Sequence, residues 1–501
     1  MPGKKTIDEI NARIARGDAV VVTAEEMVEF VKSKGAARAV KEVDVVTTGT
    51  FGAMCSSGAW LNFGHTDPPI KMQRVWLNDV EAYTGVAAVD AYIGATQLSE
   101  TRGFEYGGGH VIEDLVRGKE IHVRATAYGT DCYPRKEWES SVTLDDLNQA
   151  FLCNPRNAYQ RYVAATNSTD ETVYTYMGTL LPNFGNVNFA GTGVLSPLNK
   201  DPEYQTIGVG TRIFIAGAKG YVVWEGTQHN PTRELGTIMT IGDLKQMSAR
   251  YLRGANIHGY GTSLFVGVGV PIPVLNEKIA ESAGRGDEDI KIDLLDYGIP
   301  RRDRPVLRQV SYAELKSGKV ELNGREVKVS PLSSIKVARE IALKLKEWIE
   351  KGEFSLTQPV QCLPLDREFK PAKQTTGVVA VSSVMTREVI AAKPDELIKR
   401  AAEMFAEKNF DHLPIVDDEN RVIGIVTSWD IAVSVGKGKR KLAEIMTKKV
   451  VTAREDETID SVVRKLEKHQ ISGVPVVDVH GKLRGIVTST NLSKLIRRGK
   501  R

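Results

Sequence analysis

Residues 411–427 read DHLPIVDDENRVIGIVT, and residues 472–488 read SGVPVVDVHGKLRGIVT. Each stretch holds a short β-branched run, a polar turn and a second β-branched run that ends in threonine. This pattern predicts two strands joined by a tight turn in both places. Pro475 lies 61 positions after Pro414, and the other matching residues keep the same offset, so the chain contains an internal repeat.

The repeat extends on both sides, because residues 384–431 align with residues 445–492 without a gap. Each unit is expected to run strand, helix, strand, turn, strand, helix. The MT starts, the HLPIVD and GVPVVD segments and the two GIVTS segments resemble a tandem pair of cystathionine-β-synthase (CBS) domains. The resemblance implies CBS domains at 381–438 and 439–501 that bind an adenosine-containing ligand in the cleft between them.

Four residues are the candidates for holding that ligand. A GIVTxxD segment places a hydroxyl near phosphates and a carboxylate near ribose hydroxyls at a helix N-terminus. Thr427 and Asp430 fill these positions in the first repeat, whereas the second repeat has Thr488 and Asn491. Asparagine keeps hydrogen bonding but lacks the charge, so we expect one competent cleft and one weakened cleft. AMP, ATP and S-adenosylmethionine are the expected ligands, and a pair that serves only dimerisation is the alternative.

Composition excludes several classes of protein. The formal charge of +4 on 501 residues gives no support to nucleic-acid binding. The N-terminus lacks the apolar core of a secretory signal, and no segment is long and apolar enough to span a bilayer, so we expect a cytoplasmic protein. The four cysteines show no CxxC spacing, which argues against a metal or iron–sulfur site. No GxGxxG or P-loop motif is present in the required setting.

The composition changes near residue 370, and a polar, proline-containing stretch predicts a linker at 371–380. Residues 1–370 are predicted to form one mixed α/β (α+β) domain with a glycine-rich β component. Helices are expected in IDEINARIARGD and in TAEEMVEFVKSKG, the latter capped by Thr23 with Glu26 three residues on. Strands are expected in AVVVT and in EVDVVTTGT, which would run directly into the loop that carries Cys55.

Cys55 lies in GAMCSSGAWLNFGHTDPPIK (52–71), and Cys132 lies in RATAYGTDCYPRKEW (124–138). Each could be a reactive thiol or a small buried residue. Cys153 and Cys362 have apolar neighbours and are interpreted as packing residues. The Gly107-Gly108-Gly109 triplet before a predicted helix favours an anion site and a plain tight turn equally.

Taken together, the Cys55 and Cys132 stretches, GFEYGGGHVIEDLVRG, GTGVLSPL and GVGTRIFIAG resemble the homocysteine biosynthesis family of methanogenic archaea and some anaerobic bacteria. The resemblance covers roughly residues 10–360. It implies conversion of L-aspartate semialdehyde, reduced sulfur and two electrons to L-homocysteine. It also implies that Cys132 carries sulfur as a persulfide and that Cys55 is the partner thiol that forms a disulfide, although the two roles could be exchanged.

Further roles follow from the same resemblance. His65 would act as general acid or base, or is simply a loop histidine, and Asp67 would orient it or cap the turn. Arg124 or Arg135 would hold the substrate α-carboxylate, or would form surface ion pairs. The resemblance implies no metal and no cofactor bound in the catalytic domain, a ferredoxin-like iron–sulfur partner as electron donor, sulfide as a substrate, and a homodimer through the CBS domains.

Two other functions remain open at this point. One is a non-enzymatic sensor of adenosine ligands with a large interaction platform. The other is an aldehyde enzyme in which a single cysteine forms a thiohemiacetal without sulfur transfer. An IMP-dehydrogenase-like protein is rejected, because there the CBS pair interrupts a barrel, whereas here it follows the first domain.

Overall fold

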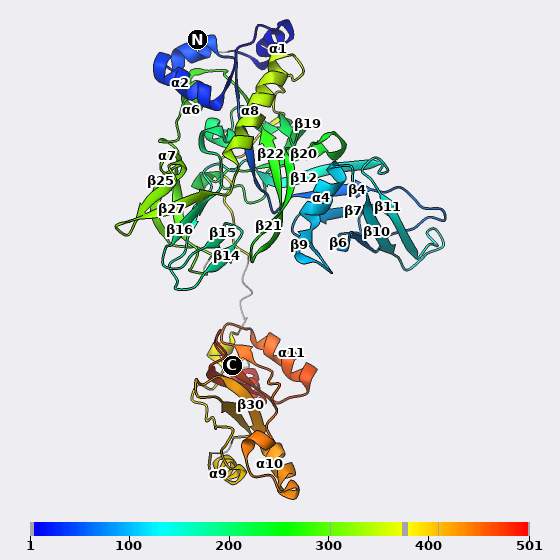
Figure 1. Ribbon diagram of the computed structural model, residues 1–501, viewed down its shortest axis with the longest axis vertical. Coiled ribbons are helices and arrows are strands. Elements are labelled where there is room, and N and C mark those ends of the chain that lie inside the picture. The colour runs from blue at the N-terminus through cyan, green and yellow to red at the C-terminus, as the bar shows by residue number, and fades with distance from the viewer. Residues whose placement is uncertain (1–4, 301, 373–378, 409, 499–501) are drawn as a thin grey trace. The chain divides into compact units, whose positions relative to one another are not determined.

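The computed structural model describes residues 5–300, 302–372, 379–408 and 410–498 (Figure 1). The chain divides into two compact units, residues 1–370 and 371–501. Both units combine helices with strands, so the predicted mixed α/β fold is confirmed. The linker predicted at 371–380 lies for the most part outside the described residues, because 373–378 are not among them.

The largest sheet of the first unit holds nine antiparallel strands. Its order is β21-β22-β18-β19-β20-β12-β4-β7, with β3 paired to β22 outside this path. The strands are β3 (Thr50–Ala53), β4 (Gly58–Asn62), β7 (Asp90–Gly94), β12 (Gln149–Asn157), β18 (Arg212–Ile215), β19 (Ala218–Glu225), β20 (Ile238–Asp243), β21 (Leu252–Ile257) and β22 (Gly261–Gly269). Helix α4 (Gly108–Val116) packs on β21 and β22, and α8 (Ile335–Glu350) packs on β22 and β3.

Two six-stranded sheets lie on either side of β21 and β22 in the view of Figure 1. One has the order β11-β10-β5-β6-β8-β9, and the other has the order β25-β24-β13-β16-β27-β26. The first consists of β5 (Arg74–Leu77), β6 (Val80–Ala82), β8 (Leu98–Ser99), β9 (Gly103–Gly107), β10 (Ile121–Thr126) and β11 (Glu137–Val142). The second consists of β13 (Ala164–Thr166), β16 (Asn186–Phe189), β24 (Lys291–Asp296), β25 (Val306–Ser311), β26 (Lys319–Leu322) and β27 (Arg325–Pro331).

Three small sheets complete the first unit. They are β1 (Val21–Thr23) with β2 (Val45–Thr47) and β23 (Pro271–Pro273), the hairpin β14 (Val173–Thr175) with β15 (Gly178–Leu180), and β17 (Gly208–Val209) with β28 (Gln361–Cys362). The strand expected in EVDVVTTGT does not run unbroken toward Cys55, because the chain leaves β2 and joins β22 as β3. The break falls beside Gly49, where a Cβ atom would lie 2.0 Å from the Ala338 carbonyl oxygen of α8.

Both N-terminal helices predicted from the sequence are confirmed. Helix α1 (Ile7–Arg16) follows Thr6, and α2 (Ala24–Lys34) follows Thr23, whose hydroxyl accepts from the Glu26 backbone N–H in a capping box. The other helices of the unit are α3 (Ala36–Glu42), α5 (Pro197–Lys200), α6 (Glu277–Ala283), α7 (Tyr312–Lys316) and the 3₁₀ turns η1 (Gly193–Leu195), η2 (Pro231–Arg233) and η3 (Leu244–Gln246). Across the described residues, helices of the length and apolarity that a bilayer crossing requires are absent.

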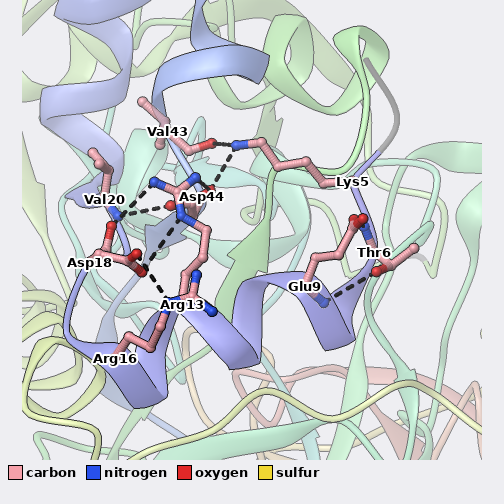
Figure 2. A network of polar contacts seen from close by, with 9 residues as sticks. All are labelled: Lys5, Thr6, Glu9, Arg13, Arg16, Asp18, Val20, Val43 and Asp44. Carbon is pink, nitrogen blue, oxygen red and sulfur yellow. Dashed lines mark hydrogen bonds and ion pairs between the residues drawn. The ribbon is translucent and has the colours of Figure 1, made fainter. Parts of the chain in front are cut away.

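A buried carboxylate joins the N-terminal helix α1 to the start of β1 in the sheet β1-β2-β23 (Figure 2). The Asp44 side chain is 0% exposed and accepts from Lys5 Nζ at 2.8 Å and from Arg13 Nη1 at 2.9 Å. It also accepts from the Val20 backbone N–H at 2.9 Å. Three donors therefore compensate the desolvation of one charge, as burial of a carboxylate requires.

The second unit contains two copies of one motif. The hairpin β29 (His412–Val416) with β30 (Val422–Thr427) and the hairpin β32 (Gly473–Val477) with β33 (Leu483–Thr488) have matching registers, displaced by 61 residues. Both contain an irregularity at the same relative position, which agrees with the repeat found in the sequence. The remaining elements are β31 (Ala453–Arg454), α9 (Ile398–Lys408), α10 (Ser428–Ser434), α11 (Ile459–His469), α12 (Ser489–Arg498), η4 (Val381–Ser383), η5 (Val435–Lys437) and η6 (Leu442–Glu444).

Candidate functional site

A cavity of about 340 Å³ in the first unit has Cys55 in its wall. Segments far apart in the sequence form this wall: the turn after β3, the end of β12, the turn between β14 and β15, and the turn between β21 and β22. The volume lies in the range of small-molecule sites. We call this space the Cys55 cavity.

Cys55 lies in a tight turn closed by a hydrogen bond from the Ser57 backbone N–H to the Met54 carbonyl. Its sulfur lies 3.2 Å from the Ser263 hydroxyl oxygen on β22. Burial raises the pKa of the Cys55 thiol, while the Ser263 hydrogen bond and the nearby charge of Arg156 act in the opposite direction. The group is therefore mainly a thiol at neutral pH, and its reaction as a nucleophile requires removal of a proton.

Tyrosine hydroxyls are the second feature of the Cys55 cavity. Tyr159, Tyr162, Tyr176 and Tyr260 all line it. Tyr162 donates to the Tyr176 oxygen at 3.2 Å, and burial raises the pKa of Tyr159 to about 12. Burial also raises the pKa of Tyr162 and Tyr260. Tyr159 and Tyr260 therefore stay protonated at neutral pH and can donate hydrogen bonds to a carbonyl oxygen.

Arg156 and Asn157 add polar groups to the same wall. Arg156 donates from Nη1 to the Gln228 side-chain oxygen, while its buried Nε has no partner. Asn157 is 0% exposed; its oxygen accepts from the Ala158 backbone N–H at 2.6 Å, and its Nδ2 has no partner. Buried donors normally have partners, so these two unused donors are a feature that requires an explanation.

Cys132 lies elsewhere, on the exposed loop between β10 and β11. This loop packs against the segment that contains His65: the His65 and Tyr133 rings stack with centroids 5.7 Å apart. Arg135 donates from Nε to the Pro68 carbonyl at 3.0 Å and from Nη2 to the Asp67 carbonyl. The structure therefore brings His65 and Arg135 to the Cys132 loop and gives the Arg135 side chain backbone partners there.

The structure does not bring Cys55 and Cys132 together. Cys55 precedes the first residue of β4, and His65, which is near the Cys132 loop, follows its last residue. A five-residue strand extends about 13 Å at a rise of 3.3 Å per residue. Figure 1 likewise places β10 and β11 at the outer edge of the unit, away from β21 and β22. A disulfide between the two thiols would require a rearrangement or a second chain.

The other sequence candidates lie outside the Cys55 cavity. The Arg124 guanidinium lies 3.8 Å from the centre of the Trp76 ring. Both residues belong to the six-stranded sheet that contains β5 and β10. Cys153 is half-buried, whereas Cys362 is exposed, so its interpretation as a packing residue is wrong. Cys362 belongs to β28, a two-residue strand whose side chains are both exposed.

The glycine triplet forms a close packing contact. The N–H groups of Gly108 and Gly109 donate to the Gln97 and Ala95 carbonyls at 2.8 and 3.1 Å. A Cβ atom on Gly109 would lie 2.2 Å from the Ser263 carbonyl oxygen of β22. Of the two interpretations, the structure favours the tight turn, because these donors are not available to an anion.

A second cavity, of about 420 Å³, lies between the two repeats of the second unit. Thr427 and Asp430 line it together with Thr447 and Lys449. The Asp430 carboxylate accepts from the Thr427 backbone N–H at 2.8 Å and from its hydroxyl at 2.6 Å. Both predicted ligand residues of the first repeat therefore lie at one cleft.

The equivalent residues of the second repeat are engaged differently. The Asn491 oxygen accepts from the Thr488 N–H and hydroxyl, both at 2.9 Å. Its Nδ2 donates across the repeat boundary to the Val384 carbonyl at 2.9 Å. The Asn491 amide nitrogen is therefore hydrogen-bonded within the protein.

These features define a two-part protein: an α/β unit with a buried thiol in a ligand-sized cavity, and a tandem repeat with its own cleft. Comparison with known families is more specific. The chain belongs to the family described as homocysteine biosynthesis enzyme, sulfur-incorporation, whose model matches residues 19–356. The CBS domain model matches residues 381–436 and 442–498. The resemblances found in the sequence are confirmed.

Two relatives match along almost the whole chain. A protein of Methanosarcina acetivorans is 54% identical over 99% of both chains, and one of Methanocaldococcus jannaschii is 54% identical over 98% of both. Each is named L-aspartate semialdehyde sulfurtransferase. Among solved structures, the CBS domain pair of protein MJ0100 in complex with 5′-methylthioadenosine and S-adenosyl-L-methionine is 43% identical. It covers 25% of this chain and 99% of that chain, with a TM-score of 0.24.

Sequence reasoning missed Arg156, Asn157 and the tyrosines of the cavity. One signal was present: Pro155 interrupts a stretch that otherwise reads as a strand. Proline inside a strand marks an edge or a bulge, and bulges redirect neighbouring side chains. The tyrosines gave no such signal, because they come from segments that only the fold brings together.

Proposed function

We propose that this protein converts L-aspartate semialdehyde and sulfide to L-homocysteine. The observation that carries the proposal is the end-to-end match, at 54% identity, to two relatives named for this activity. The Cys55 cavity supports it, because a thiol and neutral tyrosine donors line a space of the right size for a four-carbon aldehyde.

The chemistry balances with two protein thiols and an external donor of two electrons. Sulfide attacks a Cys55–Cys132 disulfide and gives a persulfide on one cysteine and a thiolate on the other. The terminal persulfide sulfur adds to the aldehyde carbon, and the free thiolate then attacks the protein sulfur of the persulfide. This attack restores the disulfide and leaves a hydroxythiol on the substrate. Loss of water gives a thioaldehyde, which two electrons and two protons reduce to the thiol of homocysteine.

The proposed roles follow the surroundings of each cysteine. Cys132 is exposed, so sulfide or a sulfur-donating protein reaches it directly, and it is the proposed persulfide carrier. Cys55 is in the cavity and acts where the aldehyde binds. His65, stacked on Tyr133 beside Cys132, is the proposed acid–base group for the loading step, and Arg135 holds the loop. The mechanism requires the Cys132 loop of the same chain or of a second chain to reach Cys55.

The electron donor and the second unit complete the proposal. Reduction requires a partner protein, and a small ferredoxin-like iron–sulfur protein has the required chemistry. An adenosyl ligand, S-adenosylmethionine or an adenine nucleotide, would bind the cleft at Thr427 and Asp430 and regulate the enzyme. A homodimer through the CBS domains is the proposed assembly.

Anaerobic assays of homocysteine formation test the proposal. The wild-type protein is incubated with L-aspartate semialdehyde, sulfide and a low-potential reductant, beside Cys55→Ala, Cys132→Ala and the matched control Cys362→Ala. We expect product from the wild type and the control, and none from the two site variants. Mass spectrometry after sulfide treatment is expected to find one added sulfur atom on Cys132. Absence of homocysteine with the wild type would refute the proposal.

The single-cysteine aldehyde enzyme is the second candidate, and the separation of Cys55 from Cys132 favours it. In that case Cys55 alone forms a thiohemiacetal with the aldehyde, and no electron donor is needed. Consumption of L-aspartate semialdehyde without sulfide or reductant, lost in Cys55→Ala and kept in full in Cys132→Ala, would select this mechanism.

A further inference from the structure

We infer that Arg156 and Asn157 form the carboxylate-binding end of the Cys55 cavity and select amino-acid aldehydes by their α-carboxylate. The inference rests on the proposed function, because it assigns one end of that substrate to named side chains. It replaces Arg124 and Arg135 as the expected carboxylate ligands.

The first argument is hydrogen bonding. Arg156 Nε and Asn157 Nδ2 are buried donors without partners, and both residues line the cavity. A ligand that supplies acceptors to these two donors would make the hydrogen bonds that buried polar groups normally have. A carboxylate has two oxygens and only accepts, which matches a pair of donors.

The second argument is backbone geometry. Side chains alternate between the two faces of a strand, so consecutive residues such as Arg156 and Asn157 should point in opposite directions. The pairing of β12 with β20 shifts register between Asn154 and Asn157. Such a bulge places two residues where the ladder has room for one and redirects a side chain. Both neighbours consequently reach the same cavity.

The third argument is charge. Of the described residues that line the Cys55 cavity, Arg156 alone carries a charge. Its nearest polar partner, Gln228, is neutral, so nothing in the wall compensates the guanidinium. An anionic ligand in the cavity would supply this compensation. Cys55 lines the same cavity of about 340 Å³, so one ligand in this space can contact both residues.

The alternative arginines lack these properties. Arg135 uses Nε and Nη2 on backbone carbonyls of the exposed loop, and Arg124 stacks on Trp76. Neither lines the cavity that contains Cys55. A carboxylate bound by either residue would hold the aldehyde away from this thiol.

Protection of Cys55 from alkylation tests the inference on the full chain without turnover. Iodoacetamide labelling of Cys55 is followed by peptide mass spectrometry in the presence of unreactive alcohols. L-Homoserine and 4-hydroxybutanoate keep the carboxylate, whereas 3-aminopropan-1-ol lacks it. We expect the first two to slow labelling and the third to have no effect. Equal protection by all three would overturn the inference.

Substitutions assign the effect to residues. A charge-assisted hydrogen bond contributes about 1.5–3 kcal/mol, so Arg156→Gln should raise the half-protecting concentration of L-homoserine about 10- to 100-fold. Asn157→Asp has the same shape and keeps the acceptor for Ala158, but it repels a carboxylate and should weaken protection similarly. Arg161→Gln is the matched control, since Arg161 pairs with Glu234, and it should not change protection.

The outcomes separate this inference from the proposed function. If L-homoserine protects Cys55 in the wild type and in both cavity variants alike, the carboxylate site is refuted even where homocysteine forms. If the variants lose protection while the wild type makes no homocysteine, the carboxylate site stands and the sulfur-transfer reaction is refuted.

Discussion

Removal of the Asp44 carboxylate should destabilise the first unit far more than removal of its exposed neighbour. Asp44→Ala leaves Lys5 and Arg13 without their common buried partner and leaves the Val20 N–H without an acceptor. Breaking a buried ion pair by deleting one partner costs about 3–5 kcal/mol. Unfolding entropy is about 2.1 cal/mol/K per residue, so a unit of 370 residues loses about 4–6 °C in Tm.

Differential scanning calorimetry of the full chain measures this shift in the transition of the first unit. Asp18→Ala is the matched control in the same network (Figure 2): Asp18 is 54% exposed and pairs with Arg16 at 3.3 Å. An exposed pair contributes about 1 kcal/mol or less, so the control should shift Tm by about 1 °C at most. Equal shifts for the two variants would refute the reasoning that burial gives the Asp44 contacts their strength.

Three further predictions concern Cys55, the packing of α4 on β22, and the second unit. Because burial raises the pKa of Cys55, its alkylation should begin at higher pH than that of a free cysteine, and Arg156→Gln should move the pH profile further upward; an unshifted profile would contradict this. Gly109→Ala should cost about 3 kcal/mol or more in urea unfolding, because the new Cβ meets the Ser263 carbonyl; a loss below 1 kcal/mol would contradict the close packing of α4 on β22. Asp430→Ala should weaken the binding of S-adenosylmethionine or AMP at least tenfold, as measured by isothermal titration calorimetry, and Asn491→Ala should weaken it less. The reverse order would contradict the assignment of the ligand to the cleft at Thr427 and Asp430.

Local signals in the sequence predicted much of the fold. The 61-residue offset predicted both hairpins of the second unit, because repeated residues repeat their backbone hydrogen bonds. The start of α2 was also predictable from a local signal, because the Thr23 hydroxyl accepts from a backbone N–H only three residues away. The interruption at Gly49 was not predicted, because its cause is α8, nearly 300 residues further along the chain.

The candidate site was predicted only in part. The sequence drew attention to Cys55 through the small residues around it, and the structure places it in a cavity. It could not indicate that Cys132 lies on a separate exposed loop, because spacing along the chain does not give distance in space. It also could not show that Arg156 and Asn157 line the same cavity, because Pro155 indicates a bulge but not which side chains the bulge redirects.

The register shift in β12 has a consequence for how this segment tolerates change. Deleting Pro155 would let β12 and β20 pair regularly through this segment. The same deletion would restore alternation and rotate the Arg156 guanidinium to the opposite face of the sheet. The length of this segment should therefore matter as much as its side chains, and a variant that lacks Pro155 should lose the protection of Cys55 by L-homoserine.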